Sequence, residues 1–338
     1  MKRVFALTIV AAAAAFAATA ASAQTLNTIK SRGVLHLGAN GTLAGFGLPD
    51  AQGAWTGLDV DFCRALAAAI FNDPTKIKFV PLTAKDRFTA LQSGDVDVLA
   101  RNTTWTSSRD TQLGLNFTGV NYYDGQGFMT PRARNRTSAL ELDGSKVCVQ
   151  SGTTTELNLA DYFRANNMKF EAAIFPALEP MLKAYESGQC DVLTADVSQL
   201  YALRLKIGKA AEHDILPDVI SKEPLSPVVR QKDDDWHLLV KWTLFAMINA
   251  EELGIDSKNI DAAMKSKKPE VMRFVGTEGD YGEWLGLSKD WAARIIRHVG
   301  NYGEVYERNV GTNSPLGIPR GLNQIWSAGG ILYAPPIR

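Results

Sequence analysis

The sequence has little of what marks a metal, nucleotide or nucleic-acid protein. It contains 4 His and 3 Cys among 338 residues, and the His residues are too scattered to suggest metal ligands. Lys and Arg total 36 and Asp and Glu total 36, so no net charge favours nucleic acid or an acidic membrane surface. The glycines between residues 38 and 53 do not form a G-x-G-x-x-G dinucleotide pattern. We therefore expect no metal, no cofactor and no nucleic-acid partner.

Beyond the N-terminal segment, the sequence contains no apolar run long enough to span a bilayer. The N-terminal segment itself has the pattern of a signal peptide. There, Lys2 and Arg3 precede an Ala-rich apolar run, and Ala21-Ser22-Ala23 forms a small-x-small cleavage pattern. We expect residues 1–23 to be a cleaved signal peptide, because no charged stop-transfer segment follows that would make the run a membrane anchor. The mature product is expected to be exported and soluble.

Export places the 3 Cys residues in an oxidising compartment, where one disulfide and one remaining thiol are the natural outcome. Cys63 lies in an apolar helical pattern and is expected to be buried. Cys148 and Cys190 each begin a short apolar run typical of a strand, so they can form a bridge if the two strands are neighbours. The sequence alone leaves this pairing open.

A repeated order of strands and helices predicts the fold class. Hydrophobic residues make up 46% of the chain, and its 338 residues suffice for two domains. The run GDVDVLA at residues 94–100 recurs as GQCDVLTA at residues 188–195. We expect two α/β lobes of similar topology with largely parallel sheets. The expected strands are 34–37, 77–81 and 96–100 in the first unit and 146–150, 170–175 and 190–195 in the second.

Polar residues follow the third strand of the first unit. Asn102, Thr104 and Arg109 lie in this loop, and loops at the carboxyl ends of strands are where open α/β sheets bind small ligands. The planar fork of Arg109 suits a carboxylate, with two parallel hydrogen bonds. The alternative is an ordinary strand-to-helix loop with a solvated Arg.

The second unit has comparable loops. Thr153 and Thr154 follow a strand and Gly152, so their hydroxyls and the free N–H groups of the next helix can meet an anion. Simple capping of that helix is the alternative. Asp196 ends the other strand, where its carboxylate can hold an ammonium group or cap the helix expected at residues 198–206.

The rest of the chain predicts a return crossing and a helical region. Residues 217–231 have an extended pattern, and a long helix is expected at residues 236–252. Shorter helices follow, with Trp284, Trp291 and Trp326. We expect these aromatic side chains to pack as a helical cap on the first lobe.

Several long motifs occur in a fixed order along the mature chain. They are GAWTGLDVDFCRALA at residues 53–67, SGDVDVLARNTTWTSSRD at 93–110, VCVQSGTTTELNL at 147–159, EPLSPVVR at 223–230, VKWTLFAMINAEE at 240–252 and YAPPIR at 333–338. With these motifs the chain resembles the amino-acid-binding family of periplasmic solute receptors that serve ABC importers. The longer motifs resemble the general L-amino-acid receptor subgroup.

The resemblance implies a two-lobed periplasmic-binding-protein fold of type II, hinged by two crossing strands, with a C-terminal helical extension on lobe 1. Lobe 1 would comprise residues 24–125 and 229–338, and lobe 2 residues 126–228. The implied function is capture of an L-amino acid in the periplasm by hinge closure. The implied partners are an ABC permease and ATPase in the inner membrane, and we expect the receptor to be a monomer.

The resemblance also implies a role for each residue of the site. Arg109 would clamp the α-carboxylate of the amino acid, and Asp196 would hold its α-ammonium group. Relatives selective for basic amino acids carry an aromatic residue near the position of Leu43, so this pocket is expected to be less selective, with Phe46 as a further candidate. The remaining ligand contacts would come from Asn102 and Thr104 in lobe 1 and from Thr153 and Thr154 in lobe 2.

Two other function classes share this fold. A dehydratase-like periplasmic enzyme would need an acid or base in the cleft, and Glu156, Asp196 and the His residues form no recognisable catalytic set. We therefore expect no enzymatic activity. A ligand sensor for a membrane receptor would need the same binding site, so the sequence does not separate it from a transport receptor.

Overall fold

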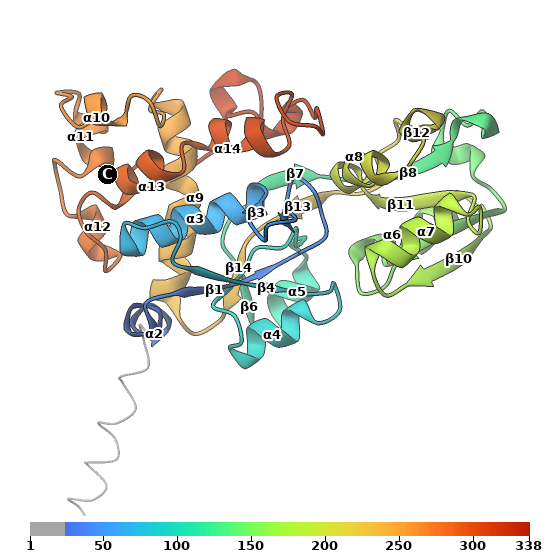
Figure 1. Ribbon diagram of the computed structural model, residues 1–338, viewed down its shortest axis with the longest axis horizontal. Helices are drawn as coiled ribbons and strands as arrows, with labels where there is room; N and C mark the ends of the chain where they lie inside the picture. Colours follow the sequence, from blue (N-terminus) through green and yellow to red (C-terminus); the bar gives the residue numbers. More distant parts are fainter. Residues whose placement is uncertain (1–23) are drawn as a thin grey trace, which may run out of the picture.

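The computed structural model describes residues 24–338, so the expected signal peptide lies outside the described residues. Two lobes, each built around its own five-stranded sheet, lie side by side along the long axis of the molecule (Figure 1). The first sheet has the order β4-β1-β5-β14-β6 and the second the order β10-β9-β11-β8-β12. The expected two-lobed α/β fold is confirmed. The strands of the first sheet are β1 (Leu35–Ala39), β4 (Ile77–Pro81), β5 (Val98–Leu99), β6 (Leu115–Phe117) and β14 (Val228–Arg230); those of the second are β8 (Gln126–Pro131), β9 (Ser145–Gln150), β10 (Phe170–Phe175), β11 (Val192–Asp196) and β12 (His213–Ile215).

Both sheets have the same mixed topology. In the first, β1 pairs in parallel with β4 and β5, and β14 runs antiparallel between β5 and β6. In the second, β9 pairs in parallel with β10 and β11, and β8 runs antiparallel between β11 and β12. The returning strand of each lobe therefore makes the sheets mixed rather than wholly parallel.

The repeated GDVDVLA and GQCDVLTA runs occupy equivalent places in the two lobes. Each begins where a helix ends, at Gly94 (φ 85°) and Gly188 (φ 76°), and leads into the central strand. This left-handed conformation is the usual helix ending and costs Gly no clash with a Cβ atom. The helices that flank the sheets are α2 (Gln24–Arg32), α3 (Leu58–Phe71), α4 (Arg87–Ser93) and α5 (Ser107–Gln112) in the first lobe, and α6 (Thr154–Ala165), α7 (Leu178–Glu186) and α8 (Val197–Lys206) in the second.

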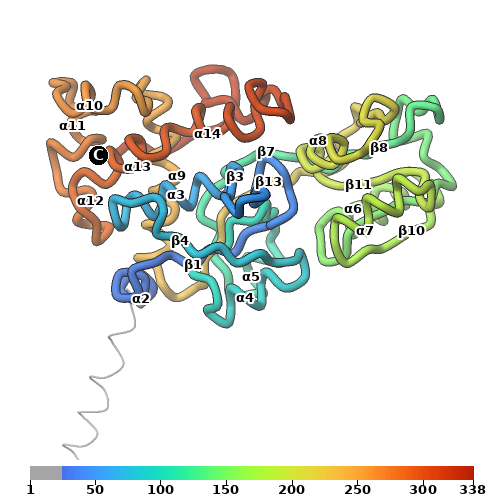
Figure 2. Tube along the Cα trace, in the orientation of Figure 1, coloured from blue at the N-terminus to red at the C-terminus, as the bar shows by residue number. Residues whose placement is uncertain are grey.

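The chain crosses between the lobes twice. The strands β7 (Tyr122–Asp124) and β13 (Glu223–Leu225) form an antiparallel ribbon, and they lie between the two lobes in the trace (Figure 2). A second short ribbon, β2 (Leu48–Pro49) with β3 (Trp55–Thr56), lies at the start of α3. The two crossings keep the ends of both sheets close together, and this is where the ligand site is expected.

The C-terminal helices pack on the first lobe, as expected. Helix α13 contacts α3 and α9, and α14 contacts the same two helices. Trp291 is buried in this layer, whereas Trp284 and Trp326 are 73% and 51% exposed, so the expectation that they pack in the cap was wrong. Within residues 24–338 no helix is both long and apolar enough to cross a membrane. The helices are α9 (Asp234–Glu252), α10 (Ile260–Ala263), α11 (Pro269–Val275), α12 (Tyr281–Trp284), α13 (Trp291–His298) and α14 (Tyr302–Asn309).

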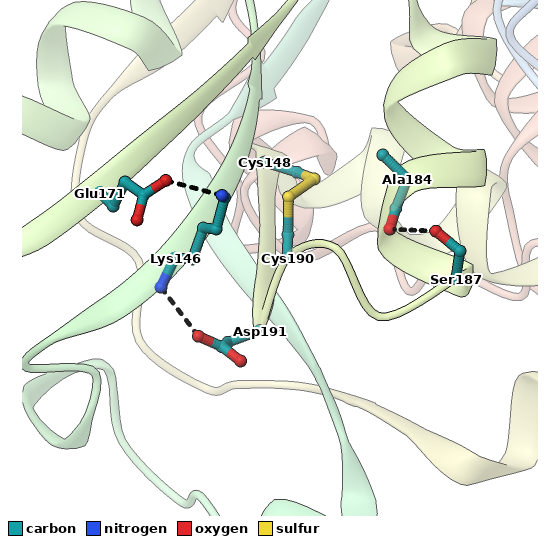
Figure 3. Close-up of a disulfide and its surroundings, with 7 residues drawn as sticks. All are labelled: Lys146, Cys148, Glu171, Ala184, Ser187, Cys190 and Asp191. Carbon is teal, nitrogen blue, oxygen red and sulfur yellow. Dashed lines mark hydrogen bonds and ion pairs between the residues drawn. A yellow bond between two sulfur atoms is a disulfide. The ribbon is translucent and has the colours of Figure 1, made fainter.

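A disulfide joins Cys148 and Cys190, which confirms the pairing considered from the sequence (Figure 3). Cys148 lies in β9, and Cys190 comes shortly before β11, the strand that pairs in parallel with β9. Their Cα atoms are 5.6 Å apart, within the usual range for a bridge. Cys63 is a free thiol buried in α3, as its apolar surroundings predicted.

Candidate ligand-binding site

A cavity lies between the two lobes, at the carboxyl ends of the central strands of both sheets. It encloses about 370 Å³ of space not filled by atoms, part of it open to solvent. Most of the lining side chains are polar or charged, and the second lobe adds an apolar part. The lining residues are Arg87, Arg101, Asn102 and Thr104 from the first lobe, and Gln150, Thr153, Thr154, Thr155, Leu178, Met181, Thr194, Ala195, Asp196 and Gln199 from the second.

A buried carboxylate holds the first-lobe loop in place. Asn102 has a left-handed backbone (φ 37°), and its N–H donates to Oδ2 of Asp59 at 2.7 Å. The side chain of Asn121 donates to Oδ1 of Asp59 at 2.9 Å, and Asn40 donates to Oδ1 of Asn102 at 2.8 Å. Burial raises the pKa of Asp59 to about 6, although these hydrogen bonds favour its charged form. Asp59 lies in the first turn of α3 and was not among the expected site residues.

Arg109 lies beside the cavity rather than in its lining. It sits in the first turn of α5, where Thr106 caps the helix, and its Nη1 donates to the carbonyl of Thr104 at 2.8 Å. Burial lowers the pKa of Arg109, and the negative charges of Glu223 and Asp196 raise it. The positive charge of Arg109 therefore interacts with the negative charges of Glu223 and Asp196 across the cleft.

The second-lobe loop caps a helix and also lines the cavity, while its contact with a ligand stays a prediction. Thr153 caps α6 by accepting from the N–H of Glu156, and it also lines the cavity. Thr154 donates to Oε2 of Glu223 at 2.8 Å. Its hydroxyl also lies 3.4 Å from that of Thr104, so this pair joins the two lobes across the cleft.

Asp196 occupies the N-cap position of α8, but its side chain makes no capping hydrogen bond. Its carboxylate accepts a long hydrogen bond of 3.4 Å from Gln199, and within residues 24–338 no Lys, Arg or His forms an ion pair with it. Burial raises its pKa well above the usual range, and the negative charges of Asp124 and Glu223 raise it further. Arg87 and Arg109 act in the opposite direction. This buried carboxylate faces the cavity without a counter-ion in contact.

Two arginines of the lining were missed as site residues. Arg87 and Arg101 are 3% and 4% exposed, and both belong to the first lobe. Arg101 begins the polar loop in the sequence, which was the available signal, whereas Arg87 looks like the polar start of an amphipathic helix. Glu223 was also missed: it is buried in β13 and accepts from Thr154, from Asn158 at 2.7 Å and from Ser221 at 2.7 Å.

Leu43 and Phe46, the candidates for the side-chain pocket, do not line the cavity. Both are buried in the hydrophobic core, and the ring of Phe46 lies 5.3 Å from that of Tyr122. The apolar part of the lining comes from Leu178 and Met181 instead. A role for Leu43 and Phe46 in selectivity remains a prediction from the resemblance alone.

Comparisons with known proteins agree on one family. A model of the bacterial extracellular solute-binding proteins, family 3, matches residues 35–258. The general L-amino acid-binding periplasmic protein AapJ of Rhizobium johnstonii is 57% identical over 330 residues, which is 97% of each chain. The glutamate/glutamine/aspartate/asparagine-binding protein BztA of Rhodobacter capsulatus is 51% identical over 97% of each chain. A solved periplasmic binding protein from Brucella ovis with glutathione bound is 54% identical and superposes with a TM-score of 0.92, covering 94% of this chain and 100% of that one.

Proposed function

The chain belongs to the bacterial extracellular solute-binding proteins of family 3, and we propose that it is the substrate-binding component of an ABC importer for L-amino acids. The relatives named for amino acids match this chain over nearly its whole length, including the C-terminal helices beyond residue 258. The proposal therefore rests on similarity over nearly the whole chain and not on the shared fold alone.

The unpaired Asp196 carboxylate carries the proposal. A buried carboxylate without a contacting cation is unfavourable in the ligand-free protein, and an α-ammonium group in the cavity would satisfy it. Arg109 stands near enough for its charge to act on Asp196, and it offers a guanidinium for the α-carboxylate. A cation site and an anion site at one cavity are what an amino-acid zwitterion requires.

The remaining lining supports acceptance of different side chains. Leu178 and Met181 offer apolar contacts, and Gln150 and Gln199 offer amides that both donate and accept hydrogen bonds. Methionine is flexible and polarisable, so it adapts to ligands of different shape. Recognition of the constant α-carbon groups with a mixed side-chain region would give a receptor for several L-amino acids.

Capture would proceed by closure of the lobes about the β7–β13 ribbon. The cavity takes residues from both lobes, and contacts such as Thr104 with Thr154 and Lys206 Nζ with the carbonyl of Thr42 (2.6 Å) would form as the lobes approach. A ligand favours the closed state only by the contacts it makes in that state and not in the open one. A zwitterion held by Arg109 from one lobe and Asp196 from the other meets this condition.

The setting of this function would be the periplasm. Residues 1–23 would direct export and be removed, and the loaded receptor, a monomer, would dock on a membrane permease driven by its ATPase. The lobes would correspond to the expected ranges, residues 24–125 with 229–338 and residues 126–228, except that Val228 follows the β13 crossing and lies in β14 of the first sheet.

Isothermal titration of the mature protein, unfolded and refolded to remove bound ligand, tests the proposal. We expect one-to-one binding of several unlike L-amino acids and no binding of a sugar. Binding of a single amino acid would retain the zwitterion site and reject broad acceptance. No binding of any amino acid would reject the proposed function and direct attention to peptides such as glutathione and to enzyme assays.

A further inference from the structure

Residues 259–338 form a C-terminal extension of the first lobe, and they lie beyond the part of the chain that the family model matches. This extension is orange to red in Figure 1, and it packs against the helices of the first lobe. Helix α14 contacts α3, and the short helical turn η5 (Gly321–Asn323) contacts the crossing strand β7. The extension therefore meets both the helix that carries Asp59 and a strand that joins the lobes.

Two buried side chains of the extension hydrogen-bond the backbone of the first crossing. The hydroxyl of Tyr302 donates to the carbonyl of Asn121, just before β7, at 2.8 Å. The side-chain amide of Asn323 accepts from the N–H of Tyr123 at 2.7 Å and donates to the carbonyl of the same residue at 3.1 Å. Tyr302 and Asn323 are 1% and 4% exposed, so these bonds are shielded from water. The extension therefore holds the first crossing at two points that are two residues apart.

A largely buried arginine fixes the tyrosines that make these contacts. The guanidinium carbon of Arg320 lies 5.2 Å from the ring centre of Tyr302 and 4.9 Å from that of Tyr306. Arg320 also pairs with Glu251 of α9 at 3.0 Å, which attaches the group to the first lobe. The ring of Tyr306 in turn stacks on that of Tyr122 in β7, with the ring centres 6.0 Å apart. Movement of the crossing away from the extension would therefore break several buried contacts at once.

Asn121 connects the crossing to the ligand cavity. Its carbonyl accepts from Tyr302, while its side-chain amide donates to Oδ1 of Asp59 at 2.9 Å. The other carboxylate oxygen of Asp59 accepts from the N–H of Asn102, whose loop lines the cavity. Asp59 and Asn121 are 3% and 2% exposed, and hydrogen bonds in such low-dielectric surroundings hold their groups firmly. A chain of buried hydrogen bonds therefore leads from the extension to the ligand site.

We propose that the C-terminal extension sets the ligand affinity, with Tyr302 and Asn323 as positioning residues that act on the cavity through Asn121 and Asp59. The inference rests on the proposed amino-acid-binding function and adds a role for the segment beyond residue 258. Tyr302 and Asn323 are not among the residues that line the cavity, so their effect does not depend on contact with a ligand. A loop already held in its binding conformation costs a ligand less free energy to order than a loose one. Every amino acid should gain affinity by a similar factor.

The test measures dissociation constants of L-glutamine and L-leucine by calorimetry, together with thermal unfolding, on stripped wild-type protein and its variants. Tyr302→Phe removes one buried hydrogen bond and keeps the ring, so it should weaken both ligands by about three- to tenfold. Asn323→Ala should weaken both ligands by a similar factor. Tyr185→Phe is the matched control, because it removes a buried hydroxyl that lies 2.7 Å from Nδ1 of His213 within the second lobe. It should lower the unfolding temperature and change neither constant.

A double-mutant cycle separates positioning from simple packing. If Tyr302 acts through Asn121, then adding Tyr302→Phe to Asn121→Ala should weaken the ligands by less than about twofold more, because the connection to Asp59 is already lost. The loss of thermal stability from Tyr302→Phe should persist beside Asn121→Ala, since the hydrogen bond to the backbone carbonyl of residue 121 is still there to be removed. A residue that only packs the extension would lower the unfolding temperature in both backgrounds and change no dissociation constant.

The outcomes separate this inference from the proposed function. Constants within about twofold of the wild type in Tyr302→Phe and Asn323→Ala would overturn the role of the extension and leave the amino-acid receptor intact. Weakening of one bound ligand and not the other would overturn it in favour of direct ligand contact. An undiminished effect of Tyr302→Phe beside Asn121→Ala would overturn the path through Asp59. Failure of the wild type to bind either ligand would overturn both the inference and the function. If Asn121→Ala does not fold, the comparison of Tyr302→Phe with Tyr185→Phe decides the question.

Discussion

Replacing Asp196 with Asn should weaken ligand binding and stabilise the ligand-free protein. Asn has nearly the same shape and is equally suited to the N-cap position of α8, so the local backbone should be preserved. The variant removes one partner of a buried charge pair with the α-ammonium group, a loss of about 2–5 kcal/mol. The affinity for any neutral L-amino acid should fall by between about thirtyfold and several thousandfold.

The variant should bind ligand more weakly and yet be more stable without ligand, because the negative charge of Asp196 is unfavourable in the ligand-free protein. Burial, together with Asp124 and Glu223, raises its pKa well above the usual range. A carboxyl group whose pKa is higher in the folded state binds more protons there, so its ionisation costs stability as the pH rises towards that pKa. At pH 7 the variant should therefore unfold at a higher temperature than the wild type, and this difference should shrink as the pH falls.

Calorimetry with L-glutamine and thermal unfolding of stripped protein at pH 7 and pH 5 provide the two readouts. Asp161→Asn on the exposed face of α6 is a matched control that should change neither, because Asp161 pairs only with exposed Arg164 outside the cleft. Affinity within about threefold of wild type would refute the assignment of the α-ammonium group to Asp196. A lower unfolding temperature for Asp196→Asn would refute the electrostatic reasoning even if binding were lost.

Three other parts of the structure carry predictions of their own. Arg109→Ala should weaken L-glutamine binding by more than about thirtyfold in calorimetry, because a carboxylate in the cleft loses its guanidinium; an unchanged constant would assign that role elsewhere. Asp59, with its pKa raised from 3.8 to about 6, should make the ligand-free protein lose up to about 3 kcal/mol of stability as the pH rises from about 4 through about 6. Urea unfolding of Asp59→Asn should lack that part of the pH slope, and an unaltered slope would contradict the raised pKa. Replacing both Cys148 and Cys190 with Ser should lower the free energy of unfolding by about 4 kcal/mol, since the bridge spans 42 residues, without changing ligand affinity; a difference below about 1 kcal/mol would contradict this.

The parts of the site that the sequence predicted are those with a local signature. Thr153, Asn102 and Asp196 each lie at or just after the end of a strand, and parallel strands bring the loops at their carboxyl ends to one edge of the sheet. The same local patterns also fit helix capping, and a residue at a capping position can still line the cavity. Thr153 caps α6 and lines the cavity, while Asp196 holds the N-cap position and leaves its carboxylate free for the cavity.

Two of the missed residues, Arg87 and Glu223, have no local signature because packing between distant segments buries them. Arg87 begins α4, where Phe88 and Leu91 have the three-residue spacing of an ordinary amphipathic surface helix. It becomes a cavity residue only because α4 packs beside the loop after β5, where it contacts Thr103. In the sequence, Glu223 likewise resembles a solvated residue before a proline. In the structure, β13 pairs with β7, and Glu223 accepts a hydrogen bond from Thr154.

Two residues of the β7–β13 ribbon, Tyr123 and Pro224, are hydrogen-bonded to the first lobe. On β7, the N–H of Tyr123 donates to the side chain of Asn323 at 2.7 Å, and Asn323 donates back to the carbonyl of Tyr123 at 3.1 Å. On β13, the carbonyl of Pro224 accepts from the N–H of Trp105 at 2.8 Å. Asn323 and Trp105 both belong to segments that pack with the first lobe, so Tyr123 and Pro224 should move with it.

The neighbouring residue on each strand is hydrogen-bonded to the second lobe. These residues are Asp124, which follows Tyr123 on β7, and Glu223, which precedes Pro224 on β13. Asp124 accepts from the N–H and hydroxyl of Ser198 in the first turn of α8, and Glu223 accepts from Thr154 in the first turn of α6. Backbone rotation during closure should therefore concentrate between residues 123 and 125 and between residues 222 and 224. Structures of the stripped and ligand-bound protein test this, and rotation spread evenly over both strands would contradict it. Because Thr154 also lines the cavity, the same hydrogen bond would couple ligand contact to the position of the hinge.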